Sequence, residues 1–183
     1  ALKERIDEYL RLIVPGIAST VVRRVEDWEV LEFEQEPVEG DRNRSFSAAV
    51  MSDGTLRALG VLAALFPSEI NGASWPVCIE EPETALHPAA AGVLLDAVHD
   101  ASERRQVFVI THSPDLLDGG VAPSELFAVR ATGNGTRVGP LDGAGRAALG
   151  ESRVSAGDLL RTDRLRPADQ NGDLPRQGAR PTR

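Results

Sequence analysis

Between residues 77 and 110, two short apolar runs flank a helical stretch, and this segment restricts the possible folds more than any other. Residues 76–79 and 107–110 are apolar, and residues 88–101 carry a helical pattern with Pro88 near the first turn. Short, continuous apolar runs are typical of strands buried in a parallel sheet. A strand, a crossover helix and a second strand form a right-handed βαβ unit. The sequence therefore predicts an α/β fold with a parallel core sheet flanked by helices.

Hydrophobic spacing and turn residues predict further elements on both sides of this unit. Apolar residues three and four apart are typical of an amphipathic helix, and β-branched runs bounded by glycine or proline are typical of strands. These signals predict a helix at residues 2–13, a partly exposed strand at 28–33 within a β-rich stretch at 21–36, a turn at 39–43, a return strand at 45–50, a buried helix at 56–66, a short helix at 113–117 and a hairpin with strands at 126–129 and 136–138. Antiparallel strands are therefore expected toward both ends of the chain.

The composition excludes several classes of protein. The 183 residues are 42% hydrophobic and 26% charged, which is typical of a globular domain and not of a disordered chain. The net charge of −8 does not fit a protein whose whole surface binds nucleic acid. No apolar run is long enough to span a membrane. The single cysteine, Cys78, excludes a disulfide within the chain and indicates a reducing compartment, so we expect a cytoplasmic location.

Acidic residues and a histidine follow the two predicted parallel strands. Glu80 and Glu81 close the first strand, and His112 follows the second. The carboxyl ends of parallel strands meet at one edge of a sheet, where ligands bind. One acid can hold Mg²⁺ while the other orients an attacking water, and the histidine can donate a hydrogen bond to a terminal phosphate. A solvated acidic turn and a structural histidine are the alternative interpretations.

A second candidate site precedes the predicted helix at residues 56–66. Ser52, Asp53 and Gly54 stand at its N-terminus, where free N–H groups and the helix dipole favour an anion such as phosphate. Gly54 allows a ligand to approach the backbone closely. An ordinary N-cap is the alternative interpretation.

Taken together, these features resemble the C-terminal half of an ATPase of the ABC class. Residues 51–57 (Met-Ser-Asp-Gly-Thr-Leu-Arg) resemble the signature motif, and residues 77–83 (Val-Cys-Ile-Glu-Glu-Pro-Glu) resemble the Walker B strand. Residues 85–88 lie where the D-loop follows, and residues 108–114 (Phe-Val-Ile-Thr-His-Ser-Pro) resemble the switch-histidine strand. The resemblance covers about residues 45–130, is weaker to about residue 160, and is nearest to the RecF-like and OLD-like predicted ATPases, sometimes grouped as AAA-type.

The resemblance implies a role for each candidate residue. Glu80 would be the metal-associated Walker B acid for Mg²⁺, Glu81 the catalytic carboxylate that polarises water, and His112 the sensor of the γ-phosphate. Ser52 and Gly54 would contact the γ-phosphate of ATP held by a partner subunit, so the resemblance implies a homodimer on ATP binding. Two positions depart from the family pattern, because Glu80 stands for the usual Asp and Asp53 for the usual first glycine.

Three other residues receive structural or open interpretations. His87 would lie at the dimer contact or belong to a plain His-Pro turn. His99 is expected to be exposed on a helix face, and Cys78 is expected to pack in the core.

The chain has no Walker A motif. That motif needs glycines followed by a lysine, and Lys3, the only lysine, has no such glycines before it. We therefore expect an N-terminal half that carries the P-loop, on the same chain or on a separate one. Without it, this chain alone is predicted to bind ATP weakly and to be inactive as an ATPase. Residues 1–160 are predicted to form the lobe, and residues 161–183 an Arg- and Pro-rich disordered tail.

Three functions remain open at this point. The first is the C-terminal part of a RecF-like or OLD-like ATPase with ATP sandwiched at a dimer interface, a family tied to DNA repair, replication or defence against phage. The second is a non-catalytic dimerisation or binding module derived from that fold. The third is a metal-dependent nuclease, which would need a later Asp-x-Asp strand that the chain does not offer. DNA is a possible partner under the first hypothesis, and no membrane is expected.

Overall fold

The computed structural model describes residues 2–36, 44–67, 75–133, 135–150 and 154–168. The chain divides into two compact units, Ala1–Leu116 and Leu117–Arg183, and each is described by itself. The turn predicted at residues 39–43 lies outside the described residues.

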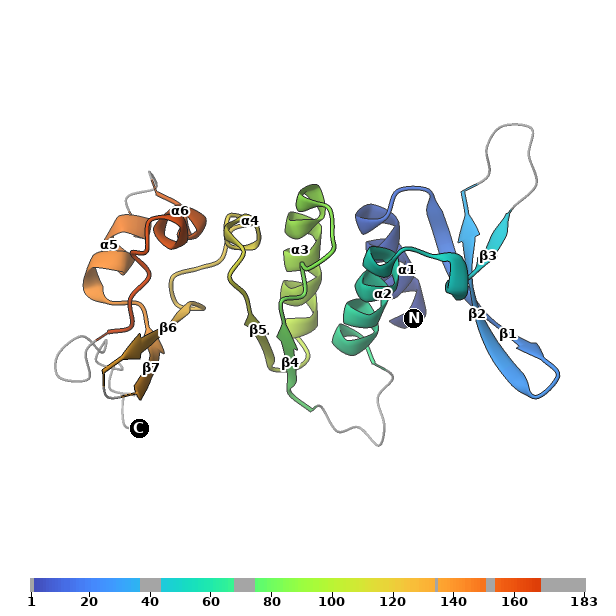
Figure 1. Cartoon of the computed structure of the whole chain (residues 1–183), viewed down its shortest axis with the longest axis horizontal. Helices are drawn as coiled ribbons and strands as arrows, with labels where there is room; N and C mark the ends of the chain where they lie inside the picture. Colours follow the sequence, from blue (N-terminus) through green and yellow to red (C-terminus); the bar gives the residue numbers. More distant parts are fainter. Residues whose placement is uncertain (1, 37–43, 68–74, 134, 151–153, 169–183) are drawn as a thin grey trace, which may run out of the picture. The chain divides into compact units, whose positions relative to one another are not determined.

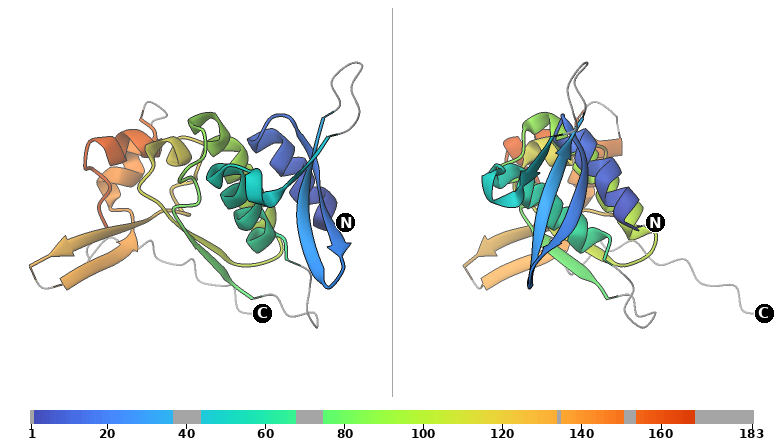
Figure 2. Two further views of the ribbon diagram at one scale, coloured as in Figure 1. Left: turned by 45° about the vertical axis from the view of Figure 1, so that its right-hand side comes forward. Right: turned by 90° about the vertical axis from the view of Figure 1, so that its right-hand side faces the viewer.

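The first unit begins with a helix and an antiparallel sheet (Figure 1). Helix α1 (Leu2–Ile13) is followed by strands β1 (Ile17–Val25), β2 (Trp28–Gln35) and β3 (Ser45–Ser47), which form a sheet in the order β1-β2-β3. The helix confirms the prediction for residues 2–13. The strand predicted at residues 28–33 is confirmed by β2, and β1 pairs antiparallel with it to form a hairpin (Figure 2). Glu26 adopts a left-handed backbone with φ of 54° in the turn.

The segment after β3 leads into the second helix. The return strand predicted at residues 45–50 is shorter, because the 3-10 helix η1 (Ala48–Val50) replaces its second half. Helix α2 (Asp53–Leu65) begins at the N-cap Ser52, as predicted. It buries one face only, through Thr55, Ala58, Val61, Leu62 and Leu65. Helix α2 is thus less deeply buried than the apolar sequence indicates.

The predicted parallel unit is present. Strand β4 (Val77–Glu80) pairs in parallel with β5 (Val107–Ile110), and between them lie the 3-10 helix η2 (Pro88–Ala90) and helix α3 (Ala91–Ser102). Helices α1, α2 and α3 pack against one another, which buries Leu10, Leu62 and Leu94 completely (Figure 1). The α/β fold with a parallel sheet, helices and antiparallel hairpins is confirmed.

The burial of the parallel strands differs from the prediction. Side chains alternate along both strands, and the face that carries Cys78, Phe108 and Ile110 is exposed. Phe108 is 50% exposed and Ile110 54% exposed. Helices α2 and α3 contact β4 and β5, and they account for the partial burial of Val77, Ile79, Val107 and Val109 on the other face. The expectation that Cys78 packs in the core is therefore wrong for this chain.

The second unit is built on another hairpin. It follows the short helix α4 (Pro114–Leu117) and contains β6 (Phe127–Thr132) and β7 (Gly135–Pro140), which pair antiparallel as predicted. Two helices that the sequence did not predict, α5 (Gly143–Gly150) and α6 (Ala156–Arg161), complete the unit. Its core consists of Leu126, Ala128, Leu141 and Ala156.

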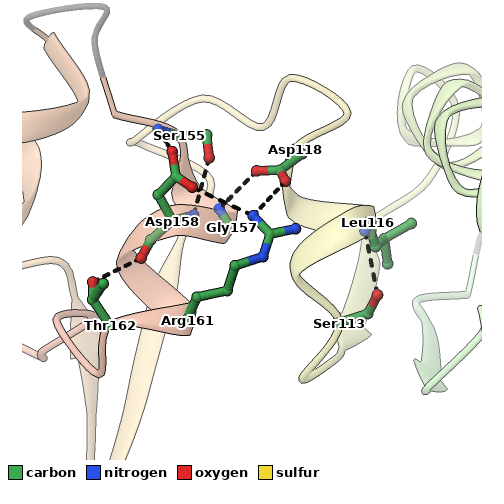
Figure 3. A network of polar contacts seen from close by, with 8 residues as sticks. All are labelled: Ser113, Leu116, Asp118, Ser155, Gly157, Asp158, Arg161 and Thr162. Carbon is green, nitrogen blue, oxygen red and sulfur yellow. Dashed lines mark hydrogen bonds and ion pairs between the residues drawn. The ribbon is translucent and has the colours of Figure 1, made fainter.

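A polar network holds the start of α6 (Figure 3). The Gly157 N–H donates to Asp118 Oδ1 at 3.1 Å, and Arg161 Nη1 lies 2.8 Å from Asp118 Oδ2. Ser155 and Asp158 form a capping box at the same end of the helix. Hydrogen bonds from the Ser155 hydroxyl and from Arg161 lower the pKa of Asp118. The carboxylate thus supplements the N-cap of a helix too short to be stable alone.

Part of the sequence assigned to a tail belongs to this unit. Arg161 closes α6, Pro167 forms an isolated bridge with Leu141, and the Ala168 N–H donates to the Pro140 carbonyl at 2.8 Å. Residues 169–183 lie outside the described residues, so the predicted disorder there stays a prediction.

Candidate functional site

The structure brings Glu81 and His112 together at the carboxyl end of the parallel strands. Glu80 and Ile110 are register partners, so the residues after them leave the sheet side by side. Nδ1 of His112 lies 2.7 Å from Oε1 of Glu81. The Glu81 side chain is 37% exposed and that of His112 78% exposed. A carboxylate and an imidazole thus form a close pair that is open to a ligand from solvent.

The backbone of Glu81 is held in an uncommon conformation. Its φ of 46° lies in the left-handed region, which costs a residue with a Cβ roughly 1–3 kcal/mol. The Glu81 N–H donates to the Ile110 carbonyl at 2.7 Å, and the Thr84 N–H donates to the Glu81 carbonyl at 3.1 Å. The Thr84 hydroxyl also donates to Glu81 Oε2 at 3.3 Å. These contacts turn the Glu81 side chain out of the strand and toward His112.

Glu80 lies on the exposed face of the sheet. It alternates with Ile79 and shares the face of Cys78. Within the described residues, no hydrogen bond or ion pair engages its carboxylate, so both oxygens are available. The separate roles that the sequence suggests for Glu80 and Glu81 stay predictions.

The described residues contain no group of three or more His, Cys, Asp or Glu side chains that could hold a metal ion by itself. Mg²⁺ at nucleotide sites, however, is bound by one or two carboxylates together with waters and substrate phosphates. A single free carboxylate at the strand end, Glu80, fits that mode of binding. It does not fit a metal cage built from protein ligands alone.

Ser52 serves as the N-cap of α2. Its Oγ accepts a hydrogen bond from the Thr55 N–H at 3.2 Å and lies 2.9 Å from the Thr55 hydroxyl oxygen. Ser52 itself is exposed, so its hydroxyl can also meet a ligand. The N-cap interpretation is thus confirmed, whereas contact with a phosphate stays a prediction.

Gly54 packs against the loop that follows Glu81. A Cβ at residue 54 would lie 2.4 Å from the carbonyl oxygen of Ala85, closer than real Cβ atoms approach. Ala85 is itself left-handed, with φ of 66°. Gly54 is therefore required for the packing of the first turn of α2 onto this loop. In the described residues, no hydrogen bond joins Ser52 or Gly54 directly to the Glu81–His112 pair.

Arg57, which sequence reasoning did not single out, connects α2 to the strand end. Its Nη2 donates to the Glu81 carbonyl at 2.8 Å and lies 3.4 Å from the Glu80 carbonyl oxygen. The only sequence signal is that Arg57 is the one charged residue in α2 after Asp53. Spacing alone does not reveal which backbone atoms it reaches.

Glu83 anchors the segment that carries His112. The Thr111 hydroxyl donates to Glu83 Oε1 at 2.5 Å, and the Ser113 N–H donates to Thr111 Oγ1 at 2.9 Å. The other carboxylate oxygen, Oε2, is buried and finds no hydrogen-bond partner among the described residues. These bonds fix the backbone on both sides of His112.

His87 acts as a cap in this structure. Its Nδ1 accepts a hydrogen bond from the Ala89 N–H at 3.2 Å at the start of η2. The plain-turn interpretation of this His-Pro pair agrees with that contact, and a place at a dimer contact stays a prediction.

The match to a family model identifies an ATPase domain of the ABC/AAA type. The chain belongs to the family described as "AAA domain, putative AbiEii toxin, Type IV TA system", whose model matches residues 3–118. No curated protein matches the chain in sequence.

Solved structures of SMC ATPases share this fold. The Smc head domain of Pyrococcus furiosus, solved with the C-terminal domain of ScpA, matches with a TM-score of 0.57 and 18% identity over 83% of this chain. The Smc head of Pyrococcus yayanosii matches with a TM-score of 0.54 and 20% identity over 83% of this chain. The chain spans 37% and 29% of the length of those two.

A third structure covers a region of similar size. It was solved in work on ATP-driven dimerization and DNA-stimulated activation of SMC ATPases, and it matches with a TM-score of 0.52 and 20% identity over 84% of this chain and 91% of its own. At these identities the likeness establishes the fold.

A membrane-spanning helix is absent from the described residues, because none of their helices combines the length and the apolar character that a span requires.

Proposed function

We propose that this chain is the C-terminal lobe of an ATP-hydrolysing protein of the RecF-like or OLD-like type, in which ATP is sandwiched between two subunits. The observation that carries the proposal is the Glu81–His112 pair at the carboxyl end of β4 and β5, with Nδ1 and Oε1 2.7 Å apart. Glu81 orients the attacking water, and His112 donates a hydrogen bond to the terminal phosphate. Family membership supports the reaction class.

Mg²⁺ would enter with ATP and be held by Glu80. When bound, the ion neutralises charge on the phosphates. The exposed Glu80 carboxylate supplies one oxygen ligand, and phosphates and waters supply the others. Ser52 and the N–H groups at the start of α2 contact the γ-phosphate of the ATP on the partner subunit.

A lobe that carries a P-loop completes the site, either on the same chain or on a separate one. The exposed apolar face of β4 and β5 supports this part of the proposal. Phe108 and Ile110 are each at least half exposed there, and parallel sheets occur almost only with both faces covered. The same face leaves Glu80 accessible to a nucleotide held by that lobe.

The biological setting belongs to the proposal as well. RecF-like and OLD-like ATPases act in DNA repair, replication or defence against phage, and one structural relative is described as a DNA-stimulated SMC ATPase. We infer DNA as the effector to test first, and the cytoplasm as the compartment. The Glu81–His112 pair favours this function over a non-catalytic module, because dimerisation alone needs neither side chain.

The test is ATP turnover by the intact gene product that contains both lobes, with and without DNA. Wild type is compared with Glu81→Gln and with a control variant, Glu103→Gln. The control replaces an exposed carboxylate that does not belong to the Glu81–His112 pair. We expect Glu81→Gln to bind ATP, to accumulate as a dimer in light scattering and to hydrolyse about 10²–10⁴-fold more slowly. Glu103→Gln should behave as wild type. Absence of both turnover and an ATP-dependent dimer in wild type would favour the non-catalytic module.

A further inference from the structure

The guanidinium of Arg57 holds the backbone on which the catalytic carboxylate is mounted. Arg57 lies in the second turn of α2, the helix whose first turn carries the signature motif. Its Nη2 lies 2.8 Å from the Glu81 carbonyl oxygen and 3.4 Å from that of Glu80. A charged donor to a carbonyl oxygen makes a stronger hydrogen bond than a neutral one. Arg57 therefore contacts the chain at the residue where β4 ends and the loop begins.

The loop needs such support because its backbone is unfavourable. Glu81 and Ala85 both adopt left-handed conformations, with φ of 46° and 66°. Residues with a Cβ keep such angles only when surrounding contacts impose them. Helix α2 supplies two of these contacts: Arg57 binds the Glu81 carbonyl, and Gly54 lies directly against the Ala85 carbonyl. The loop is thus held at both ends by one helix.

The direction of the Glu81 side chain depends on this backbone. With φ of 46°, the side chain leaves the line of β4 and reaches His112. If Glu81 relaxed to an extended backbone, its side chain would continue the alternation of the strand and leave His112. A group that fixes the Glu81 carbonyl therefore also fixes the contact between Glu81 and His112.

We propose that Arg57 is a positioning residue for Glu81, which acts from the signature helix through the Glu81 carbonyl. Arg57 keeps the carboxylate against His112 and does not itself contact nucleotide. The consequence for catalysis rests on the proposed function, whereas the consequence for the Glu81–His112 pair does not. The two are therefore tested separately.

The first test observes the pair without nucleotide. Histidine-ring ¹H–¹⁵N spectra of the full 183-residue chain are recorded for wild type, Glu81→Gln, Arg57→Ala and Arg57→Gln. Glu81→Gln defines the His112 resonances of a broken pair. We expect Arg57→Ala and Arg57→Gln to move the His112 resonances toward that position. In a further variant, Arg57→Lys, which retains a charged donor, the resonances should lie between that position and the wild-type position. Arg24→Ala removes another exposed arginine and should leave them unchanged. Wild-type His112 resonances in Arg57→Ala and Arg57→Gln would overturn the proposal.

The second test measures kcat and KM for ATP in the intact gene product. Misplacing a catalytic group by about 1 Å can cost about 100-fold in rate, so Arg57→Ala should lower kcat about 10- to 100-fold. KM should change less than about twofold, because the lost interaction does not reach the bound substrate. A raised KM at unchanged kcat would overturn the proposal, since Arg57 would then bind nucleotide. If wild type shows no turnover while the His112 resonances still depend on Arg57, the proposed function fails and the positioning of Glu81 stands.

Discussion

Gly54 and the carbonyl group of Ala85 approach so closely that no side chain fits between them. A Cβ at residue 54 would lie 2.4 Å from the Ala85 oxygen, and that oxygen belongs to the backbone and not to a flexible side chain. The glycine of the signature motif therefore has a packing role within its own chain, in addition to any contact with a phosphate. Substitutions at Gly54 act on the loop that carries Glu81.

Gly54→Ala should destabilise the chain. The loop must move by several tenths of an ångström, and overpacking of this kind typically costs about 1–3 kcal/mol. The free energy of unfolding from urea titration measures the effect. Gly60→Ala in the same helix is the matched control, because a Cβ there meets nothing within 4 Å. Gly60→Ala should stabilise the chain by up to about 1 kcal/mol. Equal effects of the two substitutions would contradict the close contact at Gly54.

Substitutions of Ser52 separate its cap role from a phosphate role. Ser52 Oγ accepts the Thr55 N–H, so Ser52→Ala should cost about 1 kcal/mol of unfolding free energy. Ser52→Asp should cost little, because aspartate is an equally good N-cap and its charge suits the helix dipole. In the intact gene product, both variants should lose the ATP-dependent dimer seen in light scattering. A normal dimer in Ser52→Asp would show that Ser52 is a cap alone.

The sequence predicted the parts of the fold that local pattern and strand order determine. Parallel pairing of β4 with β5 follows from two apolar runs joined by a helix, and it brings the residues after both strands to one edge. The meeting of Glu81 with His112 is a consequence of that register. The N-cap at Ser52 is equally local, because the cap bond joins Ser52 to Thr55, only three positions further along the chain.

Other features depend on contacts that a linear pattern does not contain. The turn between β1 and β2 places Glu26 in a left-handed conformation without glycine, so the hairpin lacks the usual turn signal. Helix α5 begins and ends with glycine, which disfavours helices, and its formation depends on tertiary packing. The exposed face of β4 and β5 was missed because an apolar strand does not reveal what covers it. Arg57 was missed because its partners are backbone carbonyls.

Acid should weaken the contact between α1 and α3. Arg5 Nε and Nη2 each lie 2.5 Å from an oxygen of Asp100, and this hydrogen bonding lowers the pKa of Asp100 from its usual value of 3.8. Because the pKa of Asp100 is lower in the folded chain than in the unfolded chain, its ionised carboxylate stabilises the fold at pH values above the usual pKa. This stabilisation is lost as the pH falls through the folded-state pKa. Wild type should therefore exceed Asp100→Asn in unfolding free energy at pH 6, and the difference should shrink below pH of about 4.

Urea titrations at several pH values measure that difference. Asp96→Asn, on the same helix, is the control, because within the described residues its carboxylate makes no ion pair. The difference between wild type and Asp96→Asn should not follow the acid dependence of the Asp100 variant. A constant difference between wild type and Asp100→Asn from pH 6 to pH of about 2 would contradict the role of the ion pair.

Thr111 should prove necessary for the segment around His112. Its hydroxyl donates to Glu83 Oε1 and accepts the Ser113 N–H. Thr111→Val removes both bonds. Glu83, whose Oε2 has no partner within the part of the chain that the structure describes, then also loses the hydrogen bond from Thr111. Leaving such a group unsatisfied costs about 1–3 kcal/mol, measurable by urea titration. Thr111→Ser keeps the hydroxyl and should retain most of the stability. A Thr111→Val variant as stable as wild type would contradict the role of the two hydrogen bonds.

Cys78 reports on whether the exposed face of β4 and β5 becomes covered. In the 183-residue chain Cys78 is exposed, so its thiol should react with Ellman's reagent at nearly the rate measured in urea. In the intact gene product, a P-loop lobe packed on this face should slow the reaction at least tenfold, because Phe108, the register partner of Cys78, would be covered with it. Cys78→Ser should abolish the signal at Cys78 and change stability by less than about 0.5 kcal/mol. Equally fast labelling of Cys78 in both proteins would show that the face stays open and that the P-loop lobe, if present, binds elsewhere.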